Sequence, residues 1–93
     1  MNENDKNILI TLAKSFKAKK IVLFGSSIES FDDARDIDIA CEGITGKMFL
    51  RFGAKLEELF DKTVDLVLIE ENSTFINEIL KKGIIIYESS NQN

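Results

Sequence analysis

Two aspartates two residues apart, Asp36 and Asp38, are of a type and spacing that could do chemistry. They alternate with Ile37 and Ile39, so in a β-strand both carboxylates lie on one face and both isoleucines on the other. Their Cα atoms would be roughly 6.5–7 Å apart, which lets both carboxylates bind one cation. Taken alone, however, the pair fits better the solvated outer face of a sheet.

A third acid, Asp65, interrupts the strongly β-branched stretch of residues 63–69. This stretch has the composition of a central strand, in which an unpaired carboxylate would be costly. Lys62 could pair with Asp65, or Asp65 could join the other two aspartates if their strands are neighbours. In the second arrangement, three carboxylates supply the hard oxygen ligands that suit Mg²⁺ or Mn²⁺, which are usually shared with phosphate oxygens and water.

A glycine and a serine, Gly25 and Ser26, follow the apolar run of residues 21–24. Glycine permits close backbone approach, and the serine hydroxyl and the free N–H groups of a following short helix could donate to a phosphate. A plain turn and helix cap is the commoner role of such a pair. The pair therefore indicates a phosphate site only in combination with the aspartates.

Composition restricts the chemistry further. The 93 residues include no histidine, which excludes Ser-His-Asp and Cys-His catalysis and His-ligated zinc. The single Cys41 lies in an apolar stretch, which predicts a small core residue in a reducing compartment. The net charge of −4 argues against an extended nucleic-acid surface. No apolar run approaches the roughly 20 residues of a membrane span and the polar start is unlike a signal peptide, so we expect a cytoplasmic protein.

The elements that must position these residues follow from hydrophobic periodicity. Helices are predicted over residues 5–19, 47–61 and from a cap at Asn72 or Ser73 to Gly83, with a short helix after Ser26. Strands are predicted over residues 21–24, 36–41, 63–69 and 84–87. The order α-β-α-β-α-β-α-β predicts an α/β (α+β) domain, a small mixed β-sheet with helices packed on it. We expect one domain over residues 1–88 and a disordered polar tail over residues 89–93.

The motifs together resemble a known family. Residues 22–26 (VLFGS), nine intervening residues, residues 36–39 (DIDI) and later residues 64–67 (VDLV) resemble the signature of the DNA polymerase β-type nucleotidyltransferase superfamily. The minimal, single-domain branch of that superfamily, often called MNT, is the best match. In element order the resemblance covers nearly the whole chain, and it implies the nucleotidyltransferase fold.

The resemblance also implies a role for each motif residue. By it, Asp36 and Asp38 bind two Mg²⁺ ions, and Asp65 completes the catalytic metal site and helps to activate the attacking hydroxyl. Gly25 and Ser26 hold the nucleoside triphosphate, with ATP as the expected donor. The reaction is then an in-line displacement at the α-phosphorus with release of pyrophosphate.

The chain departs from the family pattern between the glycine and the aspartates. Many members carry an Ala-Arg-Gly stretch soon after the Gly-Ser pair and a serine just before the first aspartate, whereas this chain has Ser-Ile-Glu-Ser at residues 27–30 and Arg35. The connecting loop is also one residue shorter than the commonest form. These differences bear on nucleotide affinity and base choice rather than on the metal ligands. A basic row elsewhere, Lys47, Arg51 and Lys55, has the spacing of one helix face, for which we expect a solvated role.

The resemblance extends to a biological setting. Stand-alone minimal nucleotidyltransferases are commonly paired with a helical HEPN-type protein, and several pairs resemble toxin–antitoxin systems in which the MNT member adenylylates a tyrosine of the HEPN ribonuclease. This implies an antitoxin that transfers AMP from ATP to a hydroxyl of such a partner. The alternative is a non-catalytic, antitoxin-like protein that neutralises its partner by binding alone. The sequence leaves the oligomeric state open, a homo-oligomer included.

Overall fold

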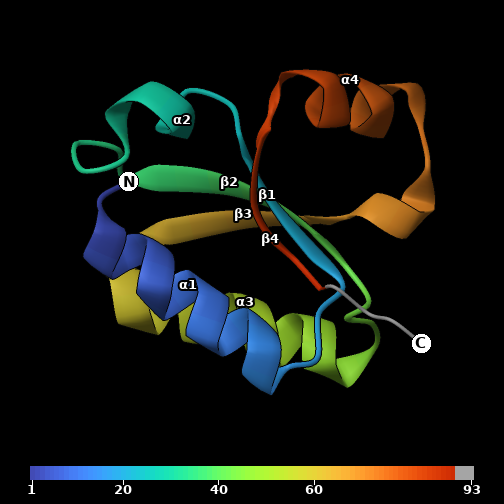
Figure 1. Ribbon diagram of the computed structural model, residues 1–93, viewed down its shortest axis with the longest axis horizontal. Helices are drawn as coiled ribbons and strands as arrows, with labels where there is room; N and C mark the ends of the chain where they lie inside the picture. The colour runs from blue at the N-terminus through green and yellow to red at the C-terminus, as the bar shows by residue number, and fades with distance from the viewer. Residues whose placement is uncertain (90–93) are drawn as a thin grey trace.

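A computed structural model describes residues 1–89 of the chain, in which a four-stranded sheet carries helices on both faces (Figure 1). The strands are β1 (Lys20–Phe24), β2 (Asp36–Glu42), β3 (Thr63–Leu68) and β4 (Ile84–Glu88). The helices are α1 (Glu3–Ser15), α2 (Ser27–Ser30), α3 (Lys47–Phe60) and α4 (Thr74–Lys82), with a 3₁₀ turn, η1 (Ile69–Glu71), after β3. The predicted α+β class and element order are confirmed.

The sheet is mixed and has the strand order β3-β2-β1-β4. Strand β1 pairs antiparallel with both β2 and β4, whereas β2 pairs parallel with β3 through the crossover helix α3. Strand β3 is thus an edge strand, and the prediction that residues 63–69 form a central strand was wrong. The strand is largely apolar because Val64 and Leu66 pack into the core beside α1 and α3, and Val67 packs under α4 on the other face.

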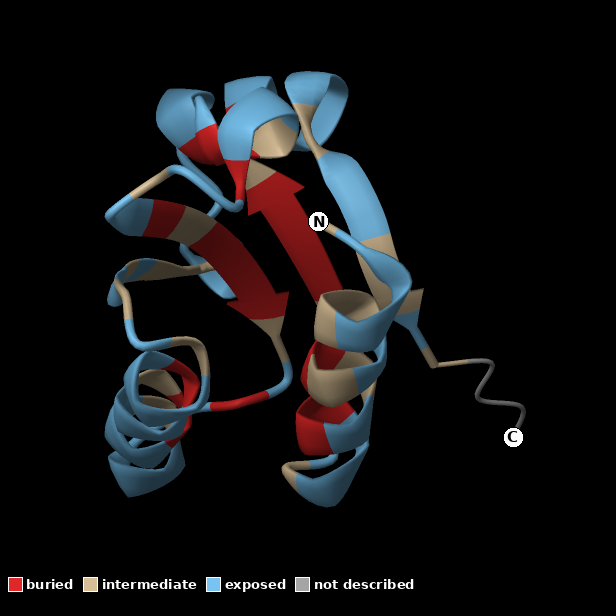
Figure 2. Cartoon of the chain, turned by 90° about the vertical axis from the view of Figure 1, so that its left-hand side faces the viewer, coloured by how far each residue is buried: buried red, intermediate tan, exposed pale blue. Residues whose placement is uncertain are grey.

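Alternation along the central strands divides the interior into two cores (Figure 2). On one face of the sheet, Ile37, Ile39 and Cys41 pack with α1 and α3 in the larger core. The smaller core, on the other face, joins Val22 and Ala40 to Ile76 and Ile79 of α4. Cys41 is fully buried, as predicted for a core residue. Helix α4 covers only part of its face, and the part beyond it carries the aspartates.

Side-chain caps and one left-handed residue determine where the helices α1 and α4 begin or end. The Asn2 side chain accepts a hydrogen bond from the Asp5 N–H at 2.7 Å and starts α1 two residues before the predicted position. Helix α1 ends at Ser15 rather than near residue 19, because Lys17 has a φ of +60° and turns the chain toward β1. The Ser73 hydroxyl accepts from the Ile76 N–H at 3.1 Å, which identifies it as the cap of α4.

The C-terminal stretch follows β4. The Ser89 N–H donates to the Lys19 carbonyl at 2.9 Å. The first residue of the predicted tail therefore lies against the turn between α1 and β1. The rest of that predicted tail, residues 90–93, lies outside the described residues. Across residues 1–89, every helix is too short or too polar to cross a membrane.

Candidate active site

The strand register brings the three predicted aspartates together. The parallel pairing of β2 with β3 places Asp38 directly opposite Asp65. Paired residues on neighbouring strands present their side chains on the same face, and Asp36 lies two residues along β2 on that face. All three aspartates line one open pocket of about 550 Å³, together with Ser26, Ala34, Arg35 and Thr63. The predicted site residues Ser26, Asp36, Asp38 and Asp65 therefore meet at one place.

The pocket is open rather than enclosed. Asp36 and Asp65 are exposed, and Asp38 is half-buried. Among residues 1–89, no three acidic or sulfur side chains are already drawn together tightly enough to enclose a metal ion. The three carboxylates are thus spread along a shared pocket wall.

The exposure of Asp65 corrects one step of the sequence argument. Burial in a central strand was expected to force a partner on this carboxylate, but β3 is an edge strand and Asp65 is exposed. Lys62 does not pair with it either. The Lys62 ammonium instead donates to the backbone carbonyls of Ala34 at 2.6 Å and Asp32 at 3.2 Å, and lies 5.4 Å from the centre of the Phe31 ring. Register, rather than burial, places Asp65 in the site.

Asp38 lies in an environment that disfavours its negative charge. Burial raises the pKa of its carboxyl above the ordinary value, and the nearby charges of Asp65 and Asp36 raise the pKa further. Each of these effects disfavours the ionised form. A cation bound between the carboxylates would remove the unfavourable interaction, so the donor set has the charge and the ligand chemistry that suit Mg²⁺.

The Asp38 carboxylate also leaves room only for glycine at position 25. Its φ is +73°, a backbone conformation that glycine adopts without strain. A Cβ added to Gly25 would clash with Oδ2 of Asp38. Only glycine therefore allows the turn after β1 to approach Asp38 so closely.

The serine that orders the site is one that sequence reasoning missed. Ser26 lines the pocket and makes no capping hydrogen bond through its side chain, so its hydroxyl is free to bind a ligand. Ser27 is fully buried instead: its hydroxyl donates to the Phe24 carbonyl at 2.9 Å and accepts from the Asp38 N–H at 3.3 Å. Ser27 thereby ties α2 to the strand that carries the aspartates. Its only sequence signal was its place beside Ser26.

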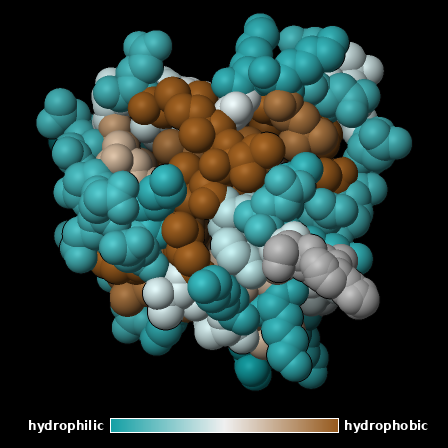
Figure 3. All heavy atoms as spheres, viewed as in Figure 1, coloured by the Kyte–Doolittle hydropathy of each residue, from teal (hydrophilic) through white to brown (hydrophobic). Residues whose placement is uncertain are grey.

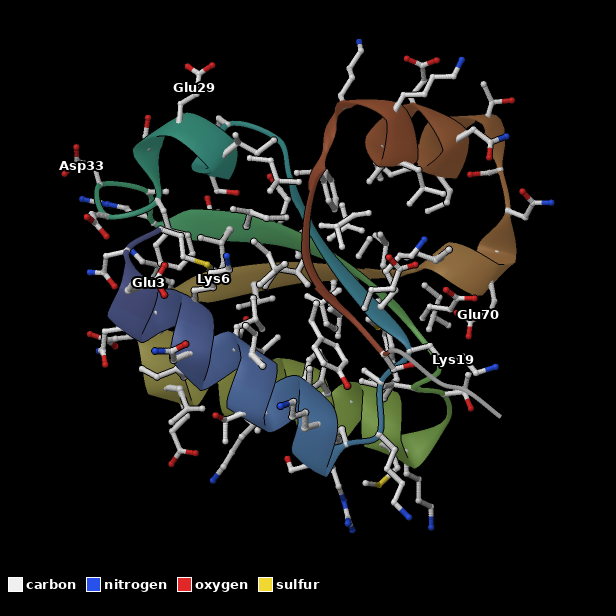
Figure 4. The ribbon with its side chains drawn as sticks, in the orientation of Figure 1. Glu3, Lys6, Lys19, Glu29, Asp33 and Glu70 are labelled. Carbon is white, nitrogen blue, oxygen red and sulfur yellow. The ribbon has the colours of Figure 1, made fainter. Side chains whose placement is uncertain are left out.

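Two acidic side chains near the site are directed away from it. Figure 4 shows Glu29 on α2 and Asp33 in the following loop directed outward into solvent. The basic row of α3 is exposed, as expected for a solvated face, and its Lys55 pairs with Glu58 at 3.3 Å.

The chain is similar to known proteins of one family. The family model for polymerase β nucleotidyltransferases matches residues 6–92 of the chain. A chain in the structure of a tri-AMPylated Shewanella oneidensis HEPN toxin in complex with an MNT antitoxin is 26% identical, with a TM-score of 0.75 over 96% of this chain and 74% of that one. A chain from a toxin–antitoxin structure with AMP-PNP is 27% identical, with a TM-score of 0.73 over 91% and 74%.

A further structure, the toxin–antitoxin MntA–HepT, is 24% identical with a TM-score of 0.73 over 95% of this chain and 74% of that chain, and so supports the fold. No curated protein matches the chain. The family model nevertheless spans nearly all of the residues, including both strands that carry the aspartates. A match of this extent shows that the chain belongs to the polymerase β nucleotidyltransferase family, in its minimal, MNT branch.

Proposed function

We propose that this chain is a Mg²⁺-dependent nucleotidyltransferase that transfers AMP from ATP to a hydroxyl of a HEPN-type protein, and so acts as the antitoxin of that partner. The observation that carries the proposal is the register of β2 against β3, which lines Asp36, Asp38 and Asp65 along one pocket beside Ser26. The similar structures described above, one with AMP-PNP and one with a tri-AMPylated HEPN toxin, support the choice of nucleotide and partner.

The pocket residues divide the work of such a transfer. Asp36, Asp38 and Asp65 would hold two Mg²⁺ ions, and the Gly25 turn with the Ser26 hydroxyl would hold the triphosphate. The chemistry supplied by the bound ions is neutralisation of the phosphate charge and a lower pKa for the acceptor hydroxyl. The lack of histidine is then no obstacle, because carboxylates alone meet the needs of the site.

The bonds formed and broken in this transfer, and the proton released, can each be assigned. The acceptor oxygen forms a bond to the α-phosphorus while the bond from that phosphorus to the bridging oxygen of the β-phosphate breaks, and pyrophosphate leaves with the electron pair. The hydroxyl proton passes to a carboxylate. Asp65 is exposed on the edge strand, where an acceptor can approach from outside the sheet, and it is the acid we assign to this step.

An exposed apolar surface supports a protein partner. Large hydrophobic side chains of α4 and β4 remain open to solvent: Phe75 is 60% exposed, Ile85 52% and Ile84 47%. Figure 3 shows a continuous hydrophobic area on the face of the molecule where β4 and α4 lie in Figure 1. Contiguous apolar surface on a small domain is characteristic of an interaction site.

The test is a mass measurement on the partner. The chain is incubated with ATP, Mg²⁺ and the HEPN-type product of a neighbouring gene, and the partner is then weighed. We expect the partner to gain the mass of one or more AMP units with the wild-type chain and with Asp33→Asn, an exposed aspartate outside the pocket, but not with the double variant Asp36→Asn, Asp38→Asn. A partner of unchanged mass, with both proteins folded and bound to each other, counts against transfer.

The second candidate is an antitoxin that neutralises by binding alone, which the exposed apolar surface also favours. The same double variant separates the two functions. If neutralisation of the partner needs Asp36 and Asp38, transfer is the mechanism. If the double variant neutralises as well as the wild type does, covering the partner is enough.

A further inference from the structure

Arg35 is the only cationic residue among those that line the aspartate pocket. It directly precedes Asp36 at the start of β2 and is exposed. It also lines the neighbouring depression formed with Glu57, Asp61 and Lys62, so it stands at the rim where the two hollows meet. One positive side chain beside three carboxylates suits a ligand that carries both anionic groups and bound cations.

Two hydrogen bonds hold the backbone at Arg35 and at the residue before it. The Thr63 N–H donates to the Arg35 carbonyl at 2.9 Å, and Lys62 donates to the carbonyl of the preceding residue, Ala34, at 2.6 Å. These bonds fix the loop to the beginning of β3. The side chain, by contrast, takes part in none of the ion pairs formed within residues 1–89. Arg35 therefore presents an uncommitted guanidinium from a fixed position.

The chemistry of a guanidinium identifies what it can hold. Its planar fork binds two oxygens of a phosphate at once, which an ammonium cannot do with the same geometry. The pocket aspartates repel a bare polyphosphate, so a cation supplied by the protein on the rim offsets part of that repulsion. Of the two arginines in the chain, Arg51 lies on α3 and lines no part of this pocket.

We propose that Arg35 binds the departing β- and γ-phosphates of the nucleotide and thereby sets the affinity for the triphosphate. This inference rests on the proposed nucleotidyltransferase function and names a residue for it that the Gly-Ser and aspartate motifs do not include. The α-phosphate has to lie at the carboxylate wall, where its phosphorus is attacked. The rim position of Arg35 therefore matches the phosphates that leave as pyrophosphate.

The test is calorimetric titration of the full chain with Mg²⁺ present, using AMP-PNP, pyrophosphate and AMP as three separate probes. The variants are Arg35→Gln, Arg35→Lys and the matched control Arg51→Gln, which removes the same charge from the same residue type. Loss of a charge-assisted bidentate contact predicts that Arg35→Gln weakens binding of AMP-PNP and pyrophosphate by about 10-fold to 100-fold. Arg35→Lys should fall between, and Arg51→Gln should bind as the wild type does. Binding of AMP should change less than threefold.

The outcomes separate this inference from the function on which it rests. If the wild type binds AMP-PNP and Arg35→Gln binds it within threefold, the assignment of Arg35 is wrong and the proposed function stands. An equal loss for AMP and AMP-PNP would place the contact on the α-phosphate and overturn the assignment to the leaving phosphates. If the wild type binds none of the probes, the proposed function fails, and Arg35 with it. Thermal melting of each variant shows that the comparison is made between folded proteins.

Discussion

Replacing Asp38 by asparagine should stabilise the metal-free protein at neutral pH. Asp38 is half-buried and faces Asp65 across the β2–β3 pairing, with Asp36 two residues away on the same face. Asparagine keeps the size and polarity of the side chain but removes its negative charge. The substitution therefore relieves two repulsive interactions and leaves the hydrogen bond from the Asp38 N–H to Ser27 in place.

The magnitude follows from the strand geometry. Neighbouring strands are about 4.8 Å apart, and residues two apart on a strand are about 6.6 Å apart. Because the pocket is open, a dielectric near that of water applies, and the two interactions come to about 0.9 and 0.6 kcal/mol, or about 1.5 kcal/mol together. At physiological salt, screening removes roughly half of this sum. For a domain of this size, about 1 kcal/mol corresponds to a melting temperature change of roughly 4–8 °C.

The sign of the pH dependence is fixed by the direction of the pKa shift. Burial and the two neighbouring carboxylates raise the pKa of Asp38 in the folded protein, so between the ordinary and the raised pKa the folded state binds more protons than the unfolded state. The free energy of unfolding of the wild type therefore falls as the pH rises through this window. The advantage of Asp38→Asn should be absent below about pH 4 and complete above the raised pKa.

The assay is thermal unfolding at low salt with a chelator, repeated at several pH values. Asp33→Asn is the matched control, because Asp33 is exposed and points away from the pocket. We expect the control to change the free energy of unfolding by less than about 0.5 kcal/mol. If Asp38→Asn melts at or below the wild-type temperature at pH 7, or if its advantage persists unchanged at acid pH, the repulsion argument is refuted.

Four further measurements test the aspartate pocket and the core of the sheet. Millimolar Mg²⁺ should raise the melting temperature of the wild type by binding the folded state, and a curve identical to that in chelator would contradict this. Gly25→Ala should weaken AMP-PNP binding more than Gly46→Ala does, because both glycines have a positive φ but only at Gly25 does the new Cβ strike the Asp38 carboxylate; equal losses, measured by titration of folded protein, would remove Asp38 from the explanation. Lys62→Ala should weaken AMP-PNP binding by releasing the loop before Asp36, and Lys62→Arg should restore part of it; an unchanged affinity in Lys62→Ala would show that the loop holds without the lysine. Burial and the nearby charge of Glu70 raise the pKa of the Cys41 thiol to about 12, so iodoacetamide should label Cys41 at neutral pH only after unfolding, whereas rapid labelling of the folded chain would disagree with its burial.

Much of the fold could be predicted from the sequence because its elements carry clear periodicity. The alternation of Asp36 and Asp38 with Ile37 and Ile39 is reproduced in β2, where both isoleucines are fully buried. This local pattern needs no knowledge of the rest of the chain. The cap of the last helix was likewise predicted to within one residue, at Asn72 or Ser73, because both residue types are preferred at helix N-termini; the structure selects Ser73.

The position of β3 in the sheet could not be predicted in the same way. The apolar residues of the stretch 63–69 indicate that side chains on both faces of the strand are packed, but they do not indicate whether another strand pairs with its outer edge. Asp65 was thus assigned to the site for a reason that the structure contradicts, although the parallel register does bring it there. Which of two adjacent serines turns inward, and which carbonyls Lys62 reaches, depend on the three-dimensional path of the loop after β1.

The openness of the aspartate pocket has a consequence for how selective the transfer can be. Bulk water is itself a nucleophile, and in a basin with exposed acids it competes with the acceptor for the α-phosphorus. A nucleotidyltransferase of this shape would waste ATP by hydrolysis whenever it works alone. The bound acceptor would then also shield the pocket from solvent. Hydrolysis of ATP in the absence of transfer should therefore fall when the partner binds.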